Sequence, residues 1–118
     1  MSFVTCLKCI DCNPACEFKK EALYVCDDCF GPLEPCYDYE NIKKELTIGK
    51  ILERPKNMWR YKELLPIDKE PTVGLNTGFT PLIKANNLAE VLGVKNLYIK
   101  NDGVNFPSLS FKDRVVAV

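Results

Sequence analysis

The sequence predicts a cysteine-rich β segment at the start of the chain, followed by a domain of the α/β class. The seven cysteines all lie in the first 36 residues, where two Cys-x-x-Cys pairs flank a β-type approach at Leu23–Val25. Further along, an amphipathic helix at Asn86–Leu92 precedes a strand at Leu97–Ile99, and another helix begins near Ser110. Helices and strands in alternation are typical of α/β domains.

The composition is that of an ordinary globular protein, with 118 residues of which 47% are hydrophobic and 27% charged. Sixteen basic and sixteen acidic side chains cancel, so no overall charge draws the chain to nucleic acid or to a membrane surface. No apolar run approaches the roughly 20 residues that cross a bilayer. The start, Met1–Cys6, lacks the regions of a signal peptide, so we expect a cytoplasmic protein.

The cysteines favour a metal site over a disulfide framework, because their count is odd and no signal peptide precedes them. The second pair of a zinc site is Cys26 with Cys29; the first is either Cys6 with Cys9 or Cys9 with Cys12. Sixteen residues separate the pairs in the first register and thirteen in the second. The first four cysteines also match an iron–sulfur spacing, which leaves the last pair unused. A four-sulfur zinc site has no open position and would be structural.

The middle of the chain predicts short helices at Tyr39–Leu46 and Met58–Leu65, joined by a connector at 47–56 that contains glycine and proline. Asn57 is expected to cap the second of these helices. We expect Trp59 to be a packing anchor rather than a ring that stacks on a ligand.

A loop is expected at 66–81, where three prolines and two glycines interrupt any regular pattern. The helix at Asn86–Leu92 should end at Gly93, which supplies the left-handed residue of a C-cap. Three apolar side chains of this helix are expected to face inward: Leu88, Val91 and Leu92. The strand at Leu97–Ile99 then runs to Lys100.

The last helix carries a capping box, in which Ser110 and Asp113 satisfy each other's backbone N–H groups before the apolar run Val115–Val118. Lys112 would lie in the first turn, where the helix dipole disfavours a charged amine. A neutral lysine amine is the form that attacks a carbonyl group. The spacing alone, however, indicates no more than a surface lysine on a capped helix.

Three segments resemble the threonine synthase family. Residues 100–114 (Lys-Asn-Asp-Gly-Val-Asn-Phe-Pro-Ser-Leu-Ser-Phe-Lys-Asp-Arg) resemble the segment that carries its pyridoxal phosphate (PLP) lysine, with Phe106 as an insertion. Asn57–Pro66 resembles the helix near the family's N-terminus, and Gly74–Leu82 resembles the segment that opens its catalytic domain. The resemblance covers most of the chain, and the three segments occur in the same order as in the family.

Leu23–Tyr39 is similar to the cysteine ribbon that opens many of these enzymes. The resemblance places the ribbon's metal ligands at Cys9, Cys12, Cys26 and Cys29, with zinc as the expected metal. It implies a zinc-ribbon-like segment at 1–39, followed at 40–118 by the incomplete start of a catalytic domain. That domain would have the fold-type II PLP-enzyme architecture, which is like that of the tryptophan synthase β subunit.

The resemblance implies that Lys112 binds PLP covalently and acts in catalysis, with Phe111 and Asn105 beside the cofactor. Asp102 and Ser108 are expected to cap and shape the turn before the lysine. The implied reaction converts O-phospho-L-homoserine and water into L-threonine and phosphate, in an enzyme that is a homo-oligomer at full length.

The chain ends inside an apolar helical run without a C-cap, and the family's glycine-rich phosphate loop is not in it. We therefore expect an N-terminal fragment that is inactive alone. Related PLP enzymes, such as cysteate synthase or threonine dehydratase, share the lysine motif and are the alternative within this class. A zinc-ribbon binding module is the alternative of another class, although acidic residues outnumber lysines in residues 1–39, which argues against nucleic acid.

Overall fold

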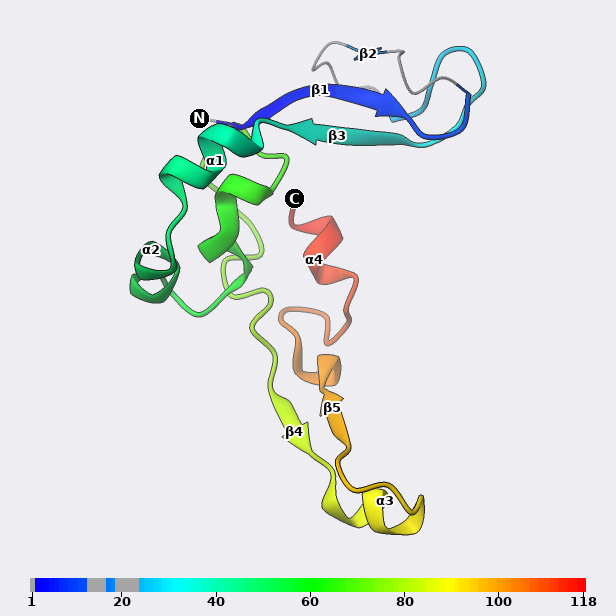
Figure 1. Cartoon of the computed structure of the whole chain (residues 1–118), viewed down its shortest axis with the longest axis vertical. Coiled ribbons are helices and arrows are strands. Elements are labelled where there is room, and N and C mark those ends of the chain that lie inside the picture. Colours follow the sequence, from blue (N-terminus) through cyan, green and yellow to red (C-terminus); the bar gives the residue numbers. More distant parts are fainter. Residues whose placement is uncertain (1, 13–16, 19–23) are drawn as a thin grey trace. The chain divides into compact units, whose positions relative to one another are not determined.

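The computed structural model describes residues 2–12, 17–18 and 24–118 (Figure 1). Contacts divide the chain into two compact units: a first unit of Met1–Glu53 with Tyr61–Glu70, and a second of Arg54–Arg60 with Pro71–Val118. The division falls within a 3₁₀ helix, η1 (Met58–Leu64), whose backbone is not helical at Tyr61. Among the described residues, no helix is both long and apolar enough to cross a membrane.

The first unit contains a three-stranded antiparallel sheet in the order β2-β1-β3. Its strands are β1 (Val4–Cys9), β2 (Glu17–Phe18) and β3 (Leu33–Tyr37). Figure 1 shows β1 and β3 as a long antiparallel pair. Beyond the sheet, Val25 and Pro32 form an isolated bridge, which confirms extended structure at the end of the predicted β-type approach. Its first residue, Leu23, lies outside the described residues.

Helix α1 (Tyr39–Glu45) follows β3 and confirms the helix predicted there. The Asp38 carboxylate accepts a hydrogen bond from the backbone N–H of Asn41 at 3.0 Å, which caps the helix. Ile42 is its buried residue, with 5% of its surface exposed. The pattern therefore predicted the helix, and Ile42 is the residue through which it packs inward.

The connector predicted at 47–56 is wrong, because α2 (Ile48–Glu53) occupies most of it. The Thr47 hydroxyl accepts a hydrogen bond from the N–H of Lys50 at 3.2 Å and so caps this helix. Gly49 lies in the first turn, where its flexibility is tolerated, and Pro55 lies beyond the last turn. Threonine capping outweighs the two residues that suggested a loop.

In the second unit, Asn57 caps η1 as predicted, since its side-chain oxygen accepts from the N–H of Trp59 at 3.1 Å. The helix is 3₁₀ rather than α. Trp59 is 8% exposed, and its indole N–H donates to the carbonyl of Gly74 at 2.9 Å. The predicted packing role of this tryptophan is confirmed, and the same hydrogen bond holds the loop at 66–81.

A two-stranded antiparallel sheet joins β4 (Leu82–Lys84) to β5 (Tyr98–Lys100). Helix α3 (Asn86–Val91) lies at the end of this hairpin (Figure 1). Gly93 has a φ of +66° and confirms the predicted C-cap. After β5 come a 3₁₀ turn, η2 (Asp102–Val104), and the last helix, α4 (Asp113–Val116).

The inward face predicted for α3 is wrong. Ala89 is its buried residue, whereas Leu88, Val91 and Leu92 are 44%, 82% and 59% exposed. The bond from the N–H of Val94 to the carbonyl of Ala89 closes the last turn of the helix. A two-stranded hairpin is too narrow to cover the apolar stripe of a helix. The described residues therefore offer too little surface to bury the apolar side chains of α3.

Removing the cap of α1 should destabilise the first unit. We expect Asp38→Ala to lower the free energy of unfolding by about 1 kcal/mol, because the backbone N–H and the side-chain amide of Asn41 lose their acceptor. Asp38→Asn keeps a capping oxygen. It should lower the free energy of unfolding by a few tenths of a kcal/mol at most, on the order of the difference between two good capping residues. Urea unfolding followed by circular dichroism measures both. Equal losses in the two variants would contradict the capping role.

Candidate functional site

Four cysteine sulfurs converge in the first unit. The Sγ atoms of Cys9, Cys12, Cys26 and Cys29 all lie within 4.8 Å of one another. Neighbouring sulfurs are 3.5 Å apart for Cys9 and Cys12, 3.5 Å for Cys9 and Cys29, and 3.6 Å for Cys12 and Cys26. A tetrahedral zinc site with bonds of about 2.3 Å places its sulfurs about 3.8 Å apart. This cluster therefore has the dimensions of a site that could hold a metal ion.

Two turns build the cluster. The N–H of Asp11 points to the Cys9 sulfur and the N–H of Gly31 to the Cys29 sulfur, each at 3.4 Å. Gly31 also allows the turns to approach, because a Cβ there would lie 2.5 Å from an oxygen of Asp11. Cys9 and Cys26 are buried, at 1% and 0% exposed. Backbone N–H groups aimed at sulfur stabilise the thiolate form that binds metal.

The electrostatics of the cluster also favour a cation. Hydrogen bonds from the backbone N–H groups of Cys12 and Asp11 lower the pKa of the Cys9 thiol to about 6. The sulfurs of Cys29, Cys9 and Cys26, in that order, raise the pKa of Cys12 through shared hydrogen bonds. One thiolate is therefore easy to form and the next is costly. A bound cation eases this conflict because it attracts all four thiolates at once.

The structure brings together the four cysteines that were predicted as ligands and leaves Cys6 out. Cys6 and Cys9 both lie in β1, where residues three apart point to opposite faces of the sheet. A regular strand thus does not direct both sulfurs of such a pair at one metal, and the cluster contains Cys9 with Cys12 rather than Cys6 with Cys9. The iron–sulfur interpretation needs Cys16, which lies outside the described residues.

Lys112 immediately precedes α4, in helical backbone geometry. The Ser110 hydroxyl accepts from the N–H of Lys112 at 3.3 Å, and the Asp113 carboxylate accepts from the N–H of Ser110 at 3.4 Å. One half of the predicted capping box is present, since the Asp113 carboxylate accepts from the N–H of Ser110. The other half is wrong, because the Ser110 hydroxyl accepts from Lys112 rather than from Asp113, and Lys112 lies at the N-cap of α4 rather than in its first turn. The Lys112 side chain is exposed, and among the described residues its amine has no hydrogen-bond or ion-pair partner.

An ion pair holds the Lys112 segment against the end of β5. Arg114 donates both terminal nitrogens to the Asp102 carboxylate, at 2.8 and 2.7 Å. Thr80 donates to the same carboxylate at 2.6 Å and accepts from Arg114 at 3.1 Å. Lys100 in turn donates to the carbonyl of Thr80. We call this set of three, Thr80, Asp102 and Arg114, the clamp.

Asn105 is 1% exposed, and its side-chain amide is engaged on both sides. Its oxygen accepts from the N–H of Gly78 at 2.8 Å, and its nitrogen donates to the carbonyl of Ser110 at 2.7 Å. Ser108 donates to the Asp113 carboxylate at 2.5 Å. The turn before the lysine is thus shaped by Ser108, as predicted, and also by Asn105. Phe111, in contrast, is 62% exposed.

Sequence patterns predicted no site role for Thr80 and Arg114, or for Thr77, which is fully buried and donates to the carbonyl of Phe106 at 2.8 Å. Each of these residues acts across more than ten positions of sequence, so no local pattern marks it. The one available signal was charge: Asp102 and Arg114 flank the same turn with opposite signs. The predicted role of Asp102 in shaping the turn is confirmed by the clamp.

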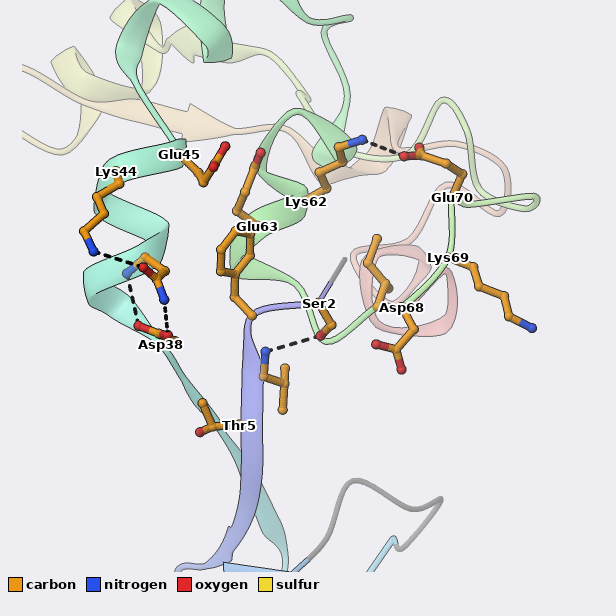
Figure 2. A pocket seen from close by; sticks show the side chains of 14 residues that line it. Ser2, Thr5, Asp38, Lys44, Glu45, Lys62, Glu63, Asp68, Lys69 and Glu70 are labelled. Carbon is orange, nitrogen blue, oxygen red and sulfur yellow. Dashed lines mark hydrogen bonds and ion pairs between the residues drawn. The ribbon is translucent and has the colours of Figure 1, made fainter.

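The first unit also contains a cavity of about 720 Å³, lined by the start of β1, by α1 and by residues 62–70 (Figure 2). Its charged side chains are of both signs and form polar contacts within the unit: Lys62 lies 2.6 Å from Glu70, and Lys44 donates to the Asn41 side chain at 3.1 Å. None of the predicted site residues lines it. The cavity therefore does not contribute to either candidate site.

Comparison with known proteins gives relatives that are threonine synthases. The chain is 42% identical over 113 residues to threonine synthase of Methanosarcina acetivorans, which is 95% of this chain and 26% of that relative. It is 45% identical over 112 residues to threonine synthase of Methanocaldococcus jannaschii, which is 94% of this chain and 27% of the relative. The chain thus spans about a quarter of the length of these curated relatives. No protein-family model matches it, and no solved structure does.

The cysteine cluster predicts a specific pattern of zinc binding. We expect the chain to bind one Zn²⁺, and Cys12→Ser to weaken this binding by more than about 100-fold, since even changes in a metal's outer shell cost 10–100-fold. Cys6→Ser is the matched control and should leave the affinity unchanged. Competition with a chromophoric chelator measures all three proteins. Zinc should also be released as the pH falls, because the thiolates become protonated.

The clamp predicts an acid-dependent stability. Hydrogen bonds from Arg114, and then from Thr80, lower the pKa of Asp102 to about 2 from its ordinary 3.8. The ionised carboxylate therefore stabilises the fold fully above about pH 4, and this contribution is lost as the pH falls toward 2. We expect urea unfolding followed by Trp59 fluorescence to show this loss.

Asp102→Asn should make the free energy of unfolding depend less on pH between about pH 4 and 2. Some loss should remain, because Ser108 lowers the pKa of Asp113 as well. An unchanged profile in the Asn variant would show that the clamp does not contribute.

Proposed function

The chain is a homologue of threonine synthases over nearly its whole length, and from this premise we propose that it is the N-terminal, lysine-bearing part of such an enzyme. The proposed reaction converts O-phospho-L-homoserine and water into L-threonine and phosphate. The observation that carries the proposal is Lys112: an exposed amine without a polar partner among the described residues, on a backbone held by Ser110, Asp113 and the clamp.

The residues present suit PLP at the point where the cofactor would be attached. Lys112 would hold it covalently through Nζ, and the same amine would carry protons to and from the substrate carbons. When bound, PLP supplies an electron sink for loss of phosphate and addition of water. The exposed ring of Phe111 is the proposed neighbour of the cofactor, and Asn105 would act on the site by fixing the turn.

The clamp would serve this chemistry by positioning. Arg114 lies two residues after Lys112, and Asp102 lies two residues after the end of β5. The bidentate pair therefore fixes the distance between the strand end and the lysine backbone, while the lysine side chain stays free to react. We expect the charge and the fork geometry of Arg114 both to matter, because a lysine there would lose one of the two bonds.

We propose that the chain divides by role into a zinc-ribbon-like segment at 1–39 and the start of a fold-type II catalytic domain at 40–118. The ribbon would hold structural zinc on the four clustered cysteines, since four sulfurs leave no position for water or substrate. Joined to the remaining three quarters, the enzyme would act on a small molecule as a cytoplasmic homo-oligomer. The described residues include no phosphate-binding loop, so the chain alone should be inactive.

Borohydride trapping tests the role of Lys112. In a chimera, this chain replaces the matched first quarter of the Methanocaldococcus jannaschii relative, and the purified protein is incubated with PLP and reduced. We expect a pyridoxyl adduct on Lys112 and formation of threonine from phosphohomoserine. Both should be lost in Lys112→Ala and Lys112→Arg, whereas Lys95→Ala, which changes another exposed lysine, should retain both.

Two other outcomes would be informative. An adduct on Lys112 without threonine formation would retain the PLP chemistry and point to a related enzyme, such as cysteate synthase or threonine dehydratase. A folded chimera with no adduct on Lys112 would overturn the proposal, and a zinc-ribbon binding module would then be the better explanation of the four-cysteine cluster.

A further inference from the structure

Two cysteines outside the metal cluster lie directly opposite each other. Cys6 of β1 is the cross-strand partner of Cys36 of β3, and both are half-buried. The Thr5 hydroxyl donates to the carbonyl of Cys36 at 3.2 Å and lies 3.8 Å from the Cys6 sulfur. The pair thus lies in antiparallel structure that is tied across its two strands.

The geometry of an antiparallel ladder brings such a pair within bonding range. Residues directly opposite have Cα atoms about 4.5 or 5.5 Å apart and side chains on the same face. A disulfide accepts Cα separations of about 4.4–6.8 Å, a range that includes both ladder spacings. The register of β1 against β3 shifts between Val4 and Cys6, so the bond would form beside this irregularity. Cβ atoms of opposite residues are about 4.5–5.5 Å apart, however, against about 3.5–4.5 Å in a disulfide. The bond would form with some strain, which makes a disulfide easier to reduce.

We propose that Cys6 and Cys36 form a redox-active dithiol that exchanges with small-molecule disulfides of the glutathione class. The thiolate of one cysteine attacks a sulfur of the disulfide, which forms a mixed disulfide and releases one thiol. The second cysteine then attacks the mixed disulfide as a thiolate and releases the second thiol. The chain loses two electrons and two protons, and the disulfide is reduced to two thiols.

The position of the pair gives this bond a consequence for the metal cluster. A bond from Cys6 to Cys36 would close a loop that contains all four clustered cysteines, Cys9, Cys12, Cys26 and Cys29. Closing a loop restricts the unfolded chain, so the two turns of the cluster would stay near each other after the metal leaves. We therefore expect the oxidised chain to release zinc to a chelator more slowly than the reduced chain.

Peptide mapping tests the proposal. The zinc-loaded chain is incubated with oxidised glutathione, its remaining thiols are alkylated in acid-quenched samples, and it is digested with trypsin. A bond from Cys6 to Cys36 joins two peptides that trypsin otherwise separates, Met1–Lys8 and Glu21–Lys43. Fragmentation of the joined peptide should assign the bond to Cys36, with two hydrogens lost, and reduced glutathione should reverse it.

Variants sharpen the assignment. Cys6→Ser and Cys36→Ser should each abolish the joined peptide, and Cys16→Ser, which changes the one cysteine outside both the pair and the cluster, should keep it. The mapping of the unchanged chain decides the question even if a variant does not fold. Alkylation of both Cys6 and Cys36, or a bond from Cys6 to a cysteine of the metal cluster, would overturn the proposal.

Discussion

The scarcity of buried apolar side chains is the constraint on which the structure of both units depends. Among the described residues, the buried hydrophobic ones are Val4, Cys9, Cys26, Ile42, Trp59 and Ala89. So few side chains supply little hydrophobic stabilisation, and small cores usually need a metal, a disulfide or a polar network in addition. The first unit has four clustered thiols for this purpose. The second has the clamp and the buried amide of Asn105, which bonds to backbone on both sides.

The two candidate sites differ in where their reactive atoms point. In the cluster, sulfurs face one another and backbone N–H groups surround them, so every donor atom is directed inward and nothing is left to bind a substrate. At Lys112 the backbone is held while the amine extends outward without a partner among the described residues. A closed site suits a structural metal, and a fixed backbone with an open amine suits covalent chemistry. The proposed division of the chain by role follows from this difference.

Local patterns predicted local structure. Spacing predicted α1, the strand that ends at Lys100, and one of the two hydrogen bonds of the capping box, the one from Ser110 to Asp113. It failed at α2, where a threonine cap outweighed Gly49 and Pro55, and at the inward face of α3. The clamp could not be predicted either, because its bonds join residues 80, 102 and 114, and only the folded chain brings them together. The resemblance to threonine synthases added the lysine's proposed role, which neither spacing nor charge supplied.

Strand alternation explains why neighbouring cysteines have different chemistry. Successive residues of β1 point to opposite faces, so Cys6 and Cys9 cannot share a partner even though only two residues separate them. Cys9 ends the strand and turns into the cluster, whereas Cys6 stays in the ladder opposite Cys36. One short strand can therefore carry a proposed metal ligand on one face and a thiol of the proposed redox pair on the other. The backbone, rather than the Cys-x-x-Cys spacing itself, determines which neighbours each thiol has, the cluster for Cys9 and Cys36 for Cys6.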